Sequence, residues 1–271
     1  MRTATPLDQP RAIGAARVSS KTGPLGSCLD GLRQSGALKL LFPRRRDIVE
    51  AILINTAGGI TGGDRFTLEA SAGARSRLMI TTQAAERAYR AQPGQIGDIR
   101  TQLRAEADST LWWLPQETIL YQGAALRRSL RVDLNENATF LMVEPVLFGR
   151  QAMGEDLTDL TFSDRIDIRR AGQPVYRDGL RFDGDVAAQL DRPAIADGAR
   201  AMANLIWISP GAKGRLDALR QLLDTQGGAS LLADDTLVMR VLAEDGFALR
   251  RTLLPLLDLL TEHTLPQSWR L

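Results

Sequence analysis

The sequence predicts a mainly β protein, built from largely antiparallel sheets with about two α-helices in the C-terminal third. Short strand-like runs recur from residue 12 to about residue 182. Several of them alternate apolar and polar residues with the period of two that characterises a half-buried strand. Leucine repeats of helical spacing appear only after Gly214. A sheet with one buried face and one solvent-exposed face is typical of antiparallel rather than doubly wound folds.

Twelve segments have the composition and period of β-strands. In the runs 126–134 and 160–168, apolar residues share one parity, and in the first of these arginine, serine and aspartate occupy the other. The predicted strands, in chain order, are residues 12–18, 37–42, 49–54, 66–70, 77–82, 99–107, 118–121, 126–134, 140–143, 160–168, 175–182 and 236–243.

Two segments near the C-terminus have the spacing of amphipathic helices. Four leucines between residues 216 and 223 form one apolar stripe, and five between 249 and 260 form a second. Pro255 must kink the second helix or begin a new one, because proline lacks the backbone donor that a helix interior needs. The pair Gly227-Gly228 between the helices is predicted to be a loop rather than a domain linker.

Composition sets the class of protein. A chain of 271 residues can bury a substantial core, and without repeats or linkers we predict one domain, with residues 1 to about 11 disordered. The net charge of +2 gives no overall field that indicates nucleic acid or membrane. A single cysteine, Cys28, fits a reducing compartment. With no signal peptide and no apolar span of 18 residues, we predict a soluble cytoplasmic protein.

A glycine-rich loop follows the predicted strand 49–54. Its signature residues are Gly58, Gly59, Gly62, Gly63 and Asp64. Glycine loses more backbone freedom on folding than other residues, so four in six positions indicate positive φ angles or a close approach of another group. A Walker loop would need a lysine after the glycines, and a dinucleotide fingerprint would need a helix. A tight connection, with the aspartate bonding local amides, is the simpler interpretation.

Residues for catalysis or tight metal binding are few. The chain has one histidine, His263, with no nucleophile motif beside it, and we interpret it as a surface residue. One histidine and one cysteine make a poor zinc or nickel cage. A metal handled here would be held weakly, by carboxylates, backbone or water. The residues therefore offer neither a catalytic constellation nor the ligands for a tightly bound cofactor.

Five motifs occur in a fixed order and together resemble one family. They are RQSGALKLLFPR (33–44), NTAGGITGGDRF (55–66), TTQAAERAYR (81–90), WLPQETILYQGA (113–124) and FLMVEPVLFGRQAMGE (140–155). In this combination they resemble the UreD family of urease accessory proteins, called UreH in some bacteria. The similarity is weakest before residue 30 and in 185–210, and Gln83-Ala84 departs from the usual pattern.

The resemblance implies a β-helix-like stack of sheets with two helices and no enzymatic activity. It implies that the chain joins UreF and the GTPase UreG on urease apoprotein and assists GTP-dependent insertion of nickel. An internal passage for nickel has been proposed in this family. The alternative from the residues themselves, a nucleotide- or phosphate-binding enzyme that uses the loop Gly58–Gly63, stays open at this point.

Within the motifs, four carboxylates are candidates for a transient nickel path: Asp64, Glu86, Glu117 and Glu144. A buried carboxylate is costly unless it is paired or binds a cation. The competing interpretation is that an arginine such as Arg65, Arg87 or Arg90 pairs with each of them.

Four further motif residues are candidates for a partner interface: Tyr89, Arg90, Phe148 and Arg150. Exposed aromatic and arginine side chains often anchor protein interfaces.

Overall fold

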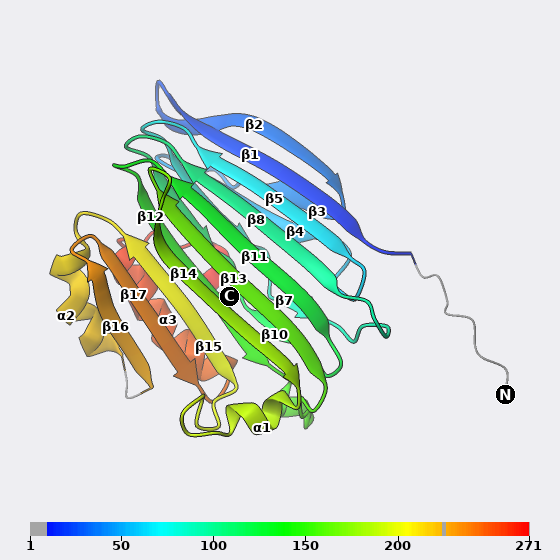
Figure 1. The fold of residues 1–271 in the computed structure, drawn as a ribbon. Helices are drawn as coiled ribbons and strands as arrows, with labels where there is room; N and C mark the ends of the chain where they lie inside the picture. Colours follow the sequence, from blue (N-terminus) through cyan, green and yellow to red (C-terminus); the bar gives the residue numbers. More distant parts are fainter. Residues whose placement is uncertain (1–9, 224–225, 271) are drawn as a thin grey trace, which may run out of the picture.

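The computed structural model describes residues 10–223 and 226–270, so part of the predicted N-terminal disorder (residues 1–9) lies outside the described residues. Two β-sheets pack face to face, and helices cover the far side of the second sheet (Figure 1). The predicted β-rich, stacked, solenoid-like architecture with helices in the C-terminal third is confirmed. Among the described residues, no helix combines the length and apolarity needed to cross a bilayer.

Sheet A has seven strands and faces the viewer in Figure 1. In spatial order they are β14 (Gln173–Gly184), β13 (Leu160–Arg170), β11 (Ala125–Leu134), β8 (Gly97–Ala105), β5 (Arg65–Ala72), β1 (Ile13–Gly23) and β2 (Gly26–Gly36).

Sheet B has ten strands among the described residues, and part of it lies behind sheet A. Its main order is β16 (Gly227–Ala233), β17 (Thr236–Ala243), β15 (Ala201–Ile208), β12 (Thr139–Phe148), β9 (Thr110–Leu114), β6 (Arg77–Thr82), β4 (Val49–Asn55) and β3 (Leu38–Leu41). Strands β15, β17 and β16 extend beyond sheet A at the left of Figure 1. The short strands β10 (Thr118–Leu120) and β7 (Glu86–Ala88) extend it beside β12.

The prediction of largely antiparallel sheets is wrong for the centre of both sheets. The pairings β5–β8–β11–β13 and β4–β6–β9–β12 are all parallel, and antiparallel pairs lie towards the two ends of the stack. Between β4 and β13 the long strands alternate between the two sheets, so the chain re-enters each sheet in the same direction and the pairs there are parallel. Consecutive strands that stay in one sheet, such as β1 and β2 or β13 and β14, pair antiparallel. The alternation in the sequence arises because sheet A has one face in the core and one in solvent, whatever the strand direction.

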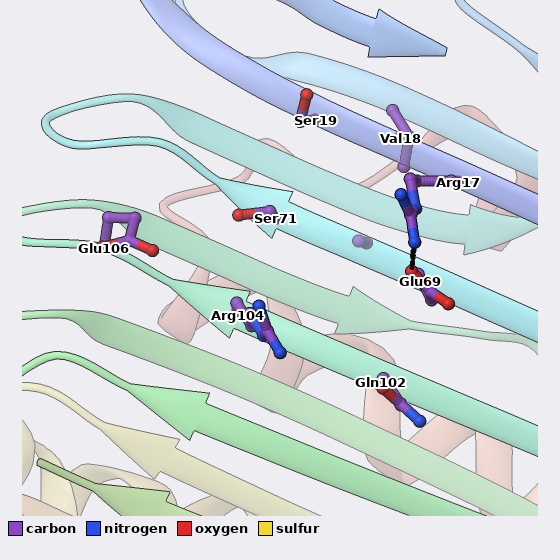
Figure 2. A pocket seen from close by; sticks show the side chains of 9 residues that line it. Arg17, Val18, Ser19, Glu69, Ser71, Gln102, Arg104 and Glu106 are labelled. Carbon is purple, nitrogen blue, oxygen red and sulfur yellow. Dashed lines mark hydrogen bonds and ion pairs between the residues drawn. The ribbon is translucent and has the colours of Figure 1, made fainter. Parts of the chain in front are cut away.

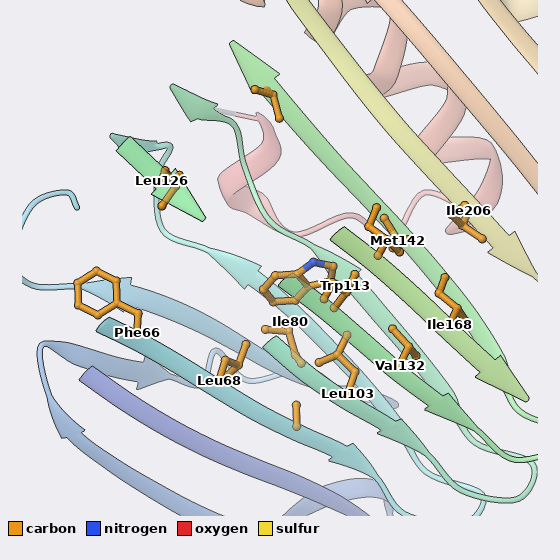
Figure 3. Close-up of a cluster of buried hydrophobic side chains, with 14 of the residues drawn as sticks. Phe66, Leu68, Ile80, Leu103, Trp113, Leu126, Val132, Met142, Ile168 and Ile206 are labelled. Carbon is orange, nitrogen blue, oxygen red and sulfur yellow. The ribbon is translucent and has the colours of Figure 1, made fainter. Parts of the chain in front are cut away.

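Two layers of apolar side chains hold the stack together. The first lies between the sheets, where Phe66, Leu103 and Ile168 of sheet A meet Trp113 and Met142 of sheet B (Figure 3). The second lies between sheet B and the helices α2 (Ala212–Leu222) and α3 (Gly246–Leu260). Burial of apolar surface of this kind stabilises a fold by about 25 cal/mol per Å².

Within residues 10–223 and 226–270, all twelve predicted strands are present, together with five that were not predicted. Strands β9 and β15 lie in sheet B between both layers, so their sequences are mainly apolar, broken only by Thr110 and Asn204, rather than alternating. Edge strand β2 is largely polar and exposed. Strand β7 has three residues, and β16 begins at Gly227, so the prediction of a loop at Gly227-Gly228 is wrong.

The predicted helices correspond to α2 and α3, and α3 continues through Pro255 without ending. A five-residue helix, α1 (Val186–Leu190), is also present. Single 3-10 turns lie at Gln151–Met153 and Gln267–Arg270. Asp245 caps α3 by accepting a hydrogen bond from the backbone N–H of Ala248 at 2.8 Å.

Candidate functional site

The glycine-rich loop joins β4 to β5 and is packed against the segment around Tyr89. A Cβ on Gly59 would lie 2.3 Å from the Tyr89 ring and 2.7 Å from the carbonyl oxygen of Arg87, so close approach explains this glycine. Gly62 is restricted in the same way by Ala91 and Gln95 and is not among the glycines with positive φ. Gly58 and Gly63 have φ angles of +79° and +89°, the left-handed region that favours glycine.

Asp64 has the structural role expected of a turn aspartate. Its carboxylate accepts the backbone N–H of Thr61 at 2.8 Å and that of Ala12 at 2.7 Å. The loop amides of Gly58, Ile60 and Gly63 donate to carbonyl oxygens of the chain itself. These amides are therefore engaged within the protein and do not form the open cradle that a phosphate group needs.

Two adjoining cavities begin beneath this loop. The outer one, of about 140 Å³, is lined by Asn55, Gly58, Gly59 and the segment 83–87. The inner one, of about 60 Å³, lies between the sheets. Leu38, Leu53, Thr82 and Glu86 line both. The inner cavity has room for a few water molecules, and its position places it between the loop surface and the core.

Glu86 stands where the two cavities meet. Its carboxylate accepts hydrogen bonds from the side-chain amide of Asn55 at 3.1 and 3.2 Å. Burial raises the pKa of Glu86, and the hydrogen bonds from Asn55 and from the backbone of Arg87 offset only part of that effect. The carboxyl group of Glu86 thus holds a proton more tightly than an exposed glutamate.

Glu144 lies at the inner end and is 3% exposed. Trp113 donates its indole N–H to one carboxylate oxygen at 2.9 Å. The other oxygen is 3.1 Å from the Arg128 guanidinium but is not in hydrogen-bonding geometry with it. Arg128 instead donates two hydrogen bonds, of 3.1 and 2.6 Å, to Asp164. Two buried carboxylates therefore share one cation.

This imbalance affects the protonation of the cluster. Burial raises the pKa of Glu144, and the neighbouring Asp164 raises it further, against the opposing effect of Arg128. Burial alone would lower the pKa of Arg128, but Asp164 and Glu144 more than offset this, so the pKa lies above its ordinary value and the guanidinium stays charged. The remaining negative charge can be balanced by a proton or by a cation in the inner cavity.

Glu117 does not line either cavity. Its buried carboxylate accepts hydrogen bonds from the guanidinium of Arg250 on α3, at 2.9 Å to each oxygen. This ion pair ties α3 to the segment between β9 and β10. The structure therefore brings Glu86 and Glu144 to two adjoining cavities that share four lining residues, and gives Asp64 and Glu117 other partners.

The competing interpretation of arginine pairing is correct for two of the four carboxylates, but through arginines distant in sequence. Glu117 pairs with Arg250, and Glu144 contacts Arg128. Within the described residues, no hydrogen bond or ion pair links any of the four carboxylates to the side chain of Arg65 or Arg90. Among the same residues, no group of three or more His, Cys, Asp or Glu side chains is arranged to hold a metal ion. The inner cavity is lined mainly by apolar side chains, with the carboxylates of Glu86 and Glu144 among a few polar groups. Two carboxylates without a histidine or cysteine beside them would hold a transition-metal ion only weakly.

The predicted interface residues fall in two places. Tyr89, which is 39% exposed, packs edge-on against Tyr121, and Arg150 lies 4.1 Å above the Tyr121 ring. The exposed Arg90 packs near Gly123 in the same region. Phe148 is 2% exposed and packs against Phe182, so its prediction as a surface contact is corrected: it belongs to the core. The predicted surface histidine, His263, is exposed.

Sequence reasoning missed Arg128 and Asp164, although a signal was present. Both lie on the apolar parity of their strands, where leucine, phenylalanine and isoleucine fill the other positions. The register places them directly opposite one another. A charged residue in the buried parity of each of two similar strands predicts an internal ion pair.

The fold and the cavities define a β-solenoid protein with a carboxylate-lined interior that opens beneath a glycine loop. Comparison with known proteins gives the family. The family model described as UreD urease accessory protein matches residues 12–270. The chain belongs to the UreD family of urease accessory proteins.

Similar proteins carry the same name. One from Roseobacter denitrificans, named urease accessory protein UreD, is 69% identical over 100% of this chain and 99% of its own length. Proteins of that name from Ruegeria sp. (strain TM1040) and Rhizobium etli are 56% and 42% identical, covering 97% and 99% of this chain and 91% and 98% of their own lengths.

Proposed function

We propose that this protein is a non-catalytic maturation factor for urease in the cytoplasm. In this role it binds UreF and the GTPase UreG, and with them urease apoprotein, and it assists GTP-dependent insertion of nickel. The family match across residues 12–270 is the observation that carries the proposal. The engaged amides of the glycine loop are consistent with it, because they leave the alternative of a phosphate-binding enzyme without a cradle.

We further propose that the connected cavities are a route for nickel ions in transit. Glu86 at the junction and Glu144 at the inner end present carboxylate oxygens to the same enclosed space. Thr82, Gln116 and Thr118 add polar side chains to its lining. Such ligands hold a divalent cation weakly, and a route requires that the ion can leave again.

Asp64 and Glu117 were predicted for the same path and remain in the test. Their carboxylates are already held, by backbone amides and by Arg250 respectively. We therefore expect them to contribute to the stability of the loop and of the helix contact, and to nickel transfer only through those contacts.

The following experiment distinguishes a role in assembling the complex (the scaffold) from a role in conducting nickel (the route). Each of Asp64, Glu86, Glu117 and Glu144 is changed to its amide, the variant is co-expressed with UreF, UreG and urease apoprotein, and the complex is isolated. Activated urease is then assayed for nickel per active site.

Glu86→Gln and Glu144→Gln should leave the complex intact and lower nickel loading. Normal loading with both variants would eliminate the route and leave the scaffold. Recovery of the wild-type chain only as a free monomer, with all three proteins present, would refute the scaffold itself.

A further inference from the structure

The outer face of sheet A carries an array of arginine side chains. Exposed positions of neighbouring strands lie directly opposite one another across the sheet, so they form rows. We call the following eleven residues the arginine face: Arg17, Arg33, Arg65, Arg100, Arg104, Arg127, Arg131, Arg165, Arg169, Arg177 and Arg181.

The charge on this face is far from balanced. Four carboxylates lie in the same rows: Glu69, Asp98, Asp133 and Asp167. Within these rows eleven arginines less four carboxylates leave a net charge of +7. Glu106 beside Arg104 and Asp183 opposite Thr161 lie just beyond the rows and lower the excess on this face to +5. The whole chain carries only +2, so positive charge is concentrated on this face.

Five of these arginines have no partner among residues 10–223 and 226–270. Arg17, Arg100, Arg127, Arg131, Arg169 and Arg177 form ion pairs within the face. No ion pair or side-chain hydrogen bond engages Arg33, Arg65, Arg104, Arg165 or Arg181 in that part of the chain. A guanidinium with five unused donors is suited to bidentate recognition of carboxylates.

Short side chains between the arginines leave three shallow hollows. One of about 460 Å³ lies beside Arg17 and Arg104, where Ser19 and Ser71 are small (Figure 2). Another of about 350 Å³ lies beside Arg65, and a third of about 530 Å³ beside Arg165. Side chains of a partner that enter these hollows would meet guanidinium groups at their walls.

The face is also large enough for a protein interface. Seven strands spaced about 4.8 Å apart, and four rows about 6.6 Å apart, cover about 600 Å² of flat sheet. This approaches the roughly 800 Å² that each partner buries in an interface of standard size.

We propose that the arginine face is a docking surface for the acidic face of a protein partner. Polyanions are less suited to it, because the four interleaved carboxylates would repel a continuous phosphate backbone or an anionic bilayer but can be offset by a partner with mixed charges. Arginine, which dominates here, is also the basic residue enriched at protein interfaces. The identity of the partner rests on the proposed function, which supplies UreF, UreG and urease apoprotein as candidates.

The test variant is the triple R33E/R165E/R181E. The cross-strand neighbours of these positions are Arg17, Ser129, Gly179 and Ser163, so the new glutamates meet no carboxylate across the sheet. The matched control is R192E/R215E/R251E, which reverses three exposed arginines away from sheet A. Urea unfolding of both confirms that the fold is retained. Binding of each full-length variant to UreF, to UreG and to urease apoprotein is measured in separate experiments at 50 and 300 mM NaCl. Binding to a 20-bp DNA duplex and to phosphatidylserine vesicles is measured under the same conditions.

We expect at least one of the three proteins to bind the triple variant about tenfold or more weakly than wild type at 50 mM NaCl, with a smaller difference at 300 mM. The control should bind like wild type. Equal binding of all three proteins to both variants would overturn the inference, as would a loss confined to DNA or vesicles. If wild type binds none of the three proteins, the proposed function fails instead.

Discussion

Removing the buried guanidinium of Arg128 is the most direct test of the internal charge cluster. The change Arg128→Met keeps an unbranched, apolar side chain but leaves Glu144 and Asp164 without their shared cation. Breaking a buried pair by removing one partner costs about 3–5 kcal/mol, because the remaining charge is buried and uncompensated. Total stabilities of about 5–15 kcal/mol are usual for a domain, so the variant should lie close to the limit of folding at pH 7.

The expected cost depends on pH in a defined direction. Burial already raises the pKa of Glu144, and Arg128 is the cation that opposes this effect. Without Arg128 the pKa of Glu144 rises further, so the folded state binds a proton more tightly than the unfolded state. Part of the stability lost at pH 7 is then regained as the pH falls and Glu144 becomes neutral. The triple variant R128M/E144Q/D164N, which has no charge in the cluster, should recover most of the stability at pH 7.

The assay is urea unfolding followed by circular dichroism at pH 5, 6 and 7. Arg100→Met is the control, because the Arg100 guanidinium is exposed and Arg127 remains beside Asp98 when it is removed, so the cost should be that of an exposed pair, about 0–1 kcal/mol. The reasoning is refuted if Arg128→Met costs no more than Arg100→Met, or if its cost is the same at pH 5 and pH 7.

Two further predictions concern single residues. Burial raises the folded-state pKa of Glu144 above its ordinary value of 4.5, so the folded state holds the proton more tightly and the wild type loses stability as pH rises above that value. Glu144→Gln cannot ionise and should therefore gain stability relative to wild type as pH rises. A difference in urea unfolding that does not change with pH would contradict this. Gly58→Ala should lower the free energy of unfolding by about 1 kcal/mol, because of the positive φ at this position alone. Gly59→Ala should lower it by about 1–3 kcal/mol more, because the new Cβ would clash with Tyr89 and Arg87. Equal urea-unfolding midpoints for the two variants would refute the packing argument.

The candidate site was only partly predictable. The sequence marked Glu86 and Glu144 as carboxylates within apolar segments, and both line the cavities. It marked Asp64 and Glu117 on the same grounds, but those side chains are held by the backbone and by Arg250. Whether a carboxylate meets a cavity, an amide or an arginine depends on which strand or helix lies opposite. Sequence neighbours do not specify that.

The sequence by itself determined the local structure: twelve strands, two leucine-striped helices and a glycine loop, because side-chain period and glycine chemistry act over a few residues. Only the tertiary structure decided the strand directions, because side chains alternate between the buried and the solvent-exposed face in the same way in parallel and antiparallel sheets. The same holds for the arginine face. A composition with a net charge of +2 conceals it, and only the register of seven strands gathers eleven arginines on one surface.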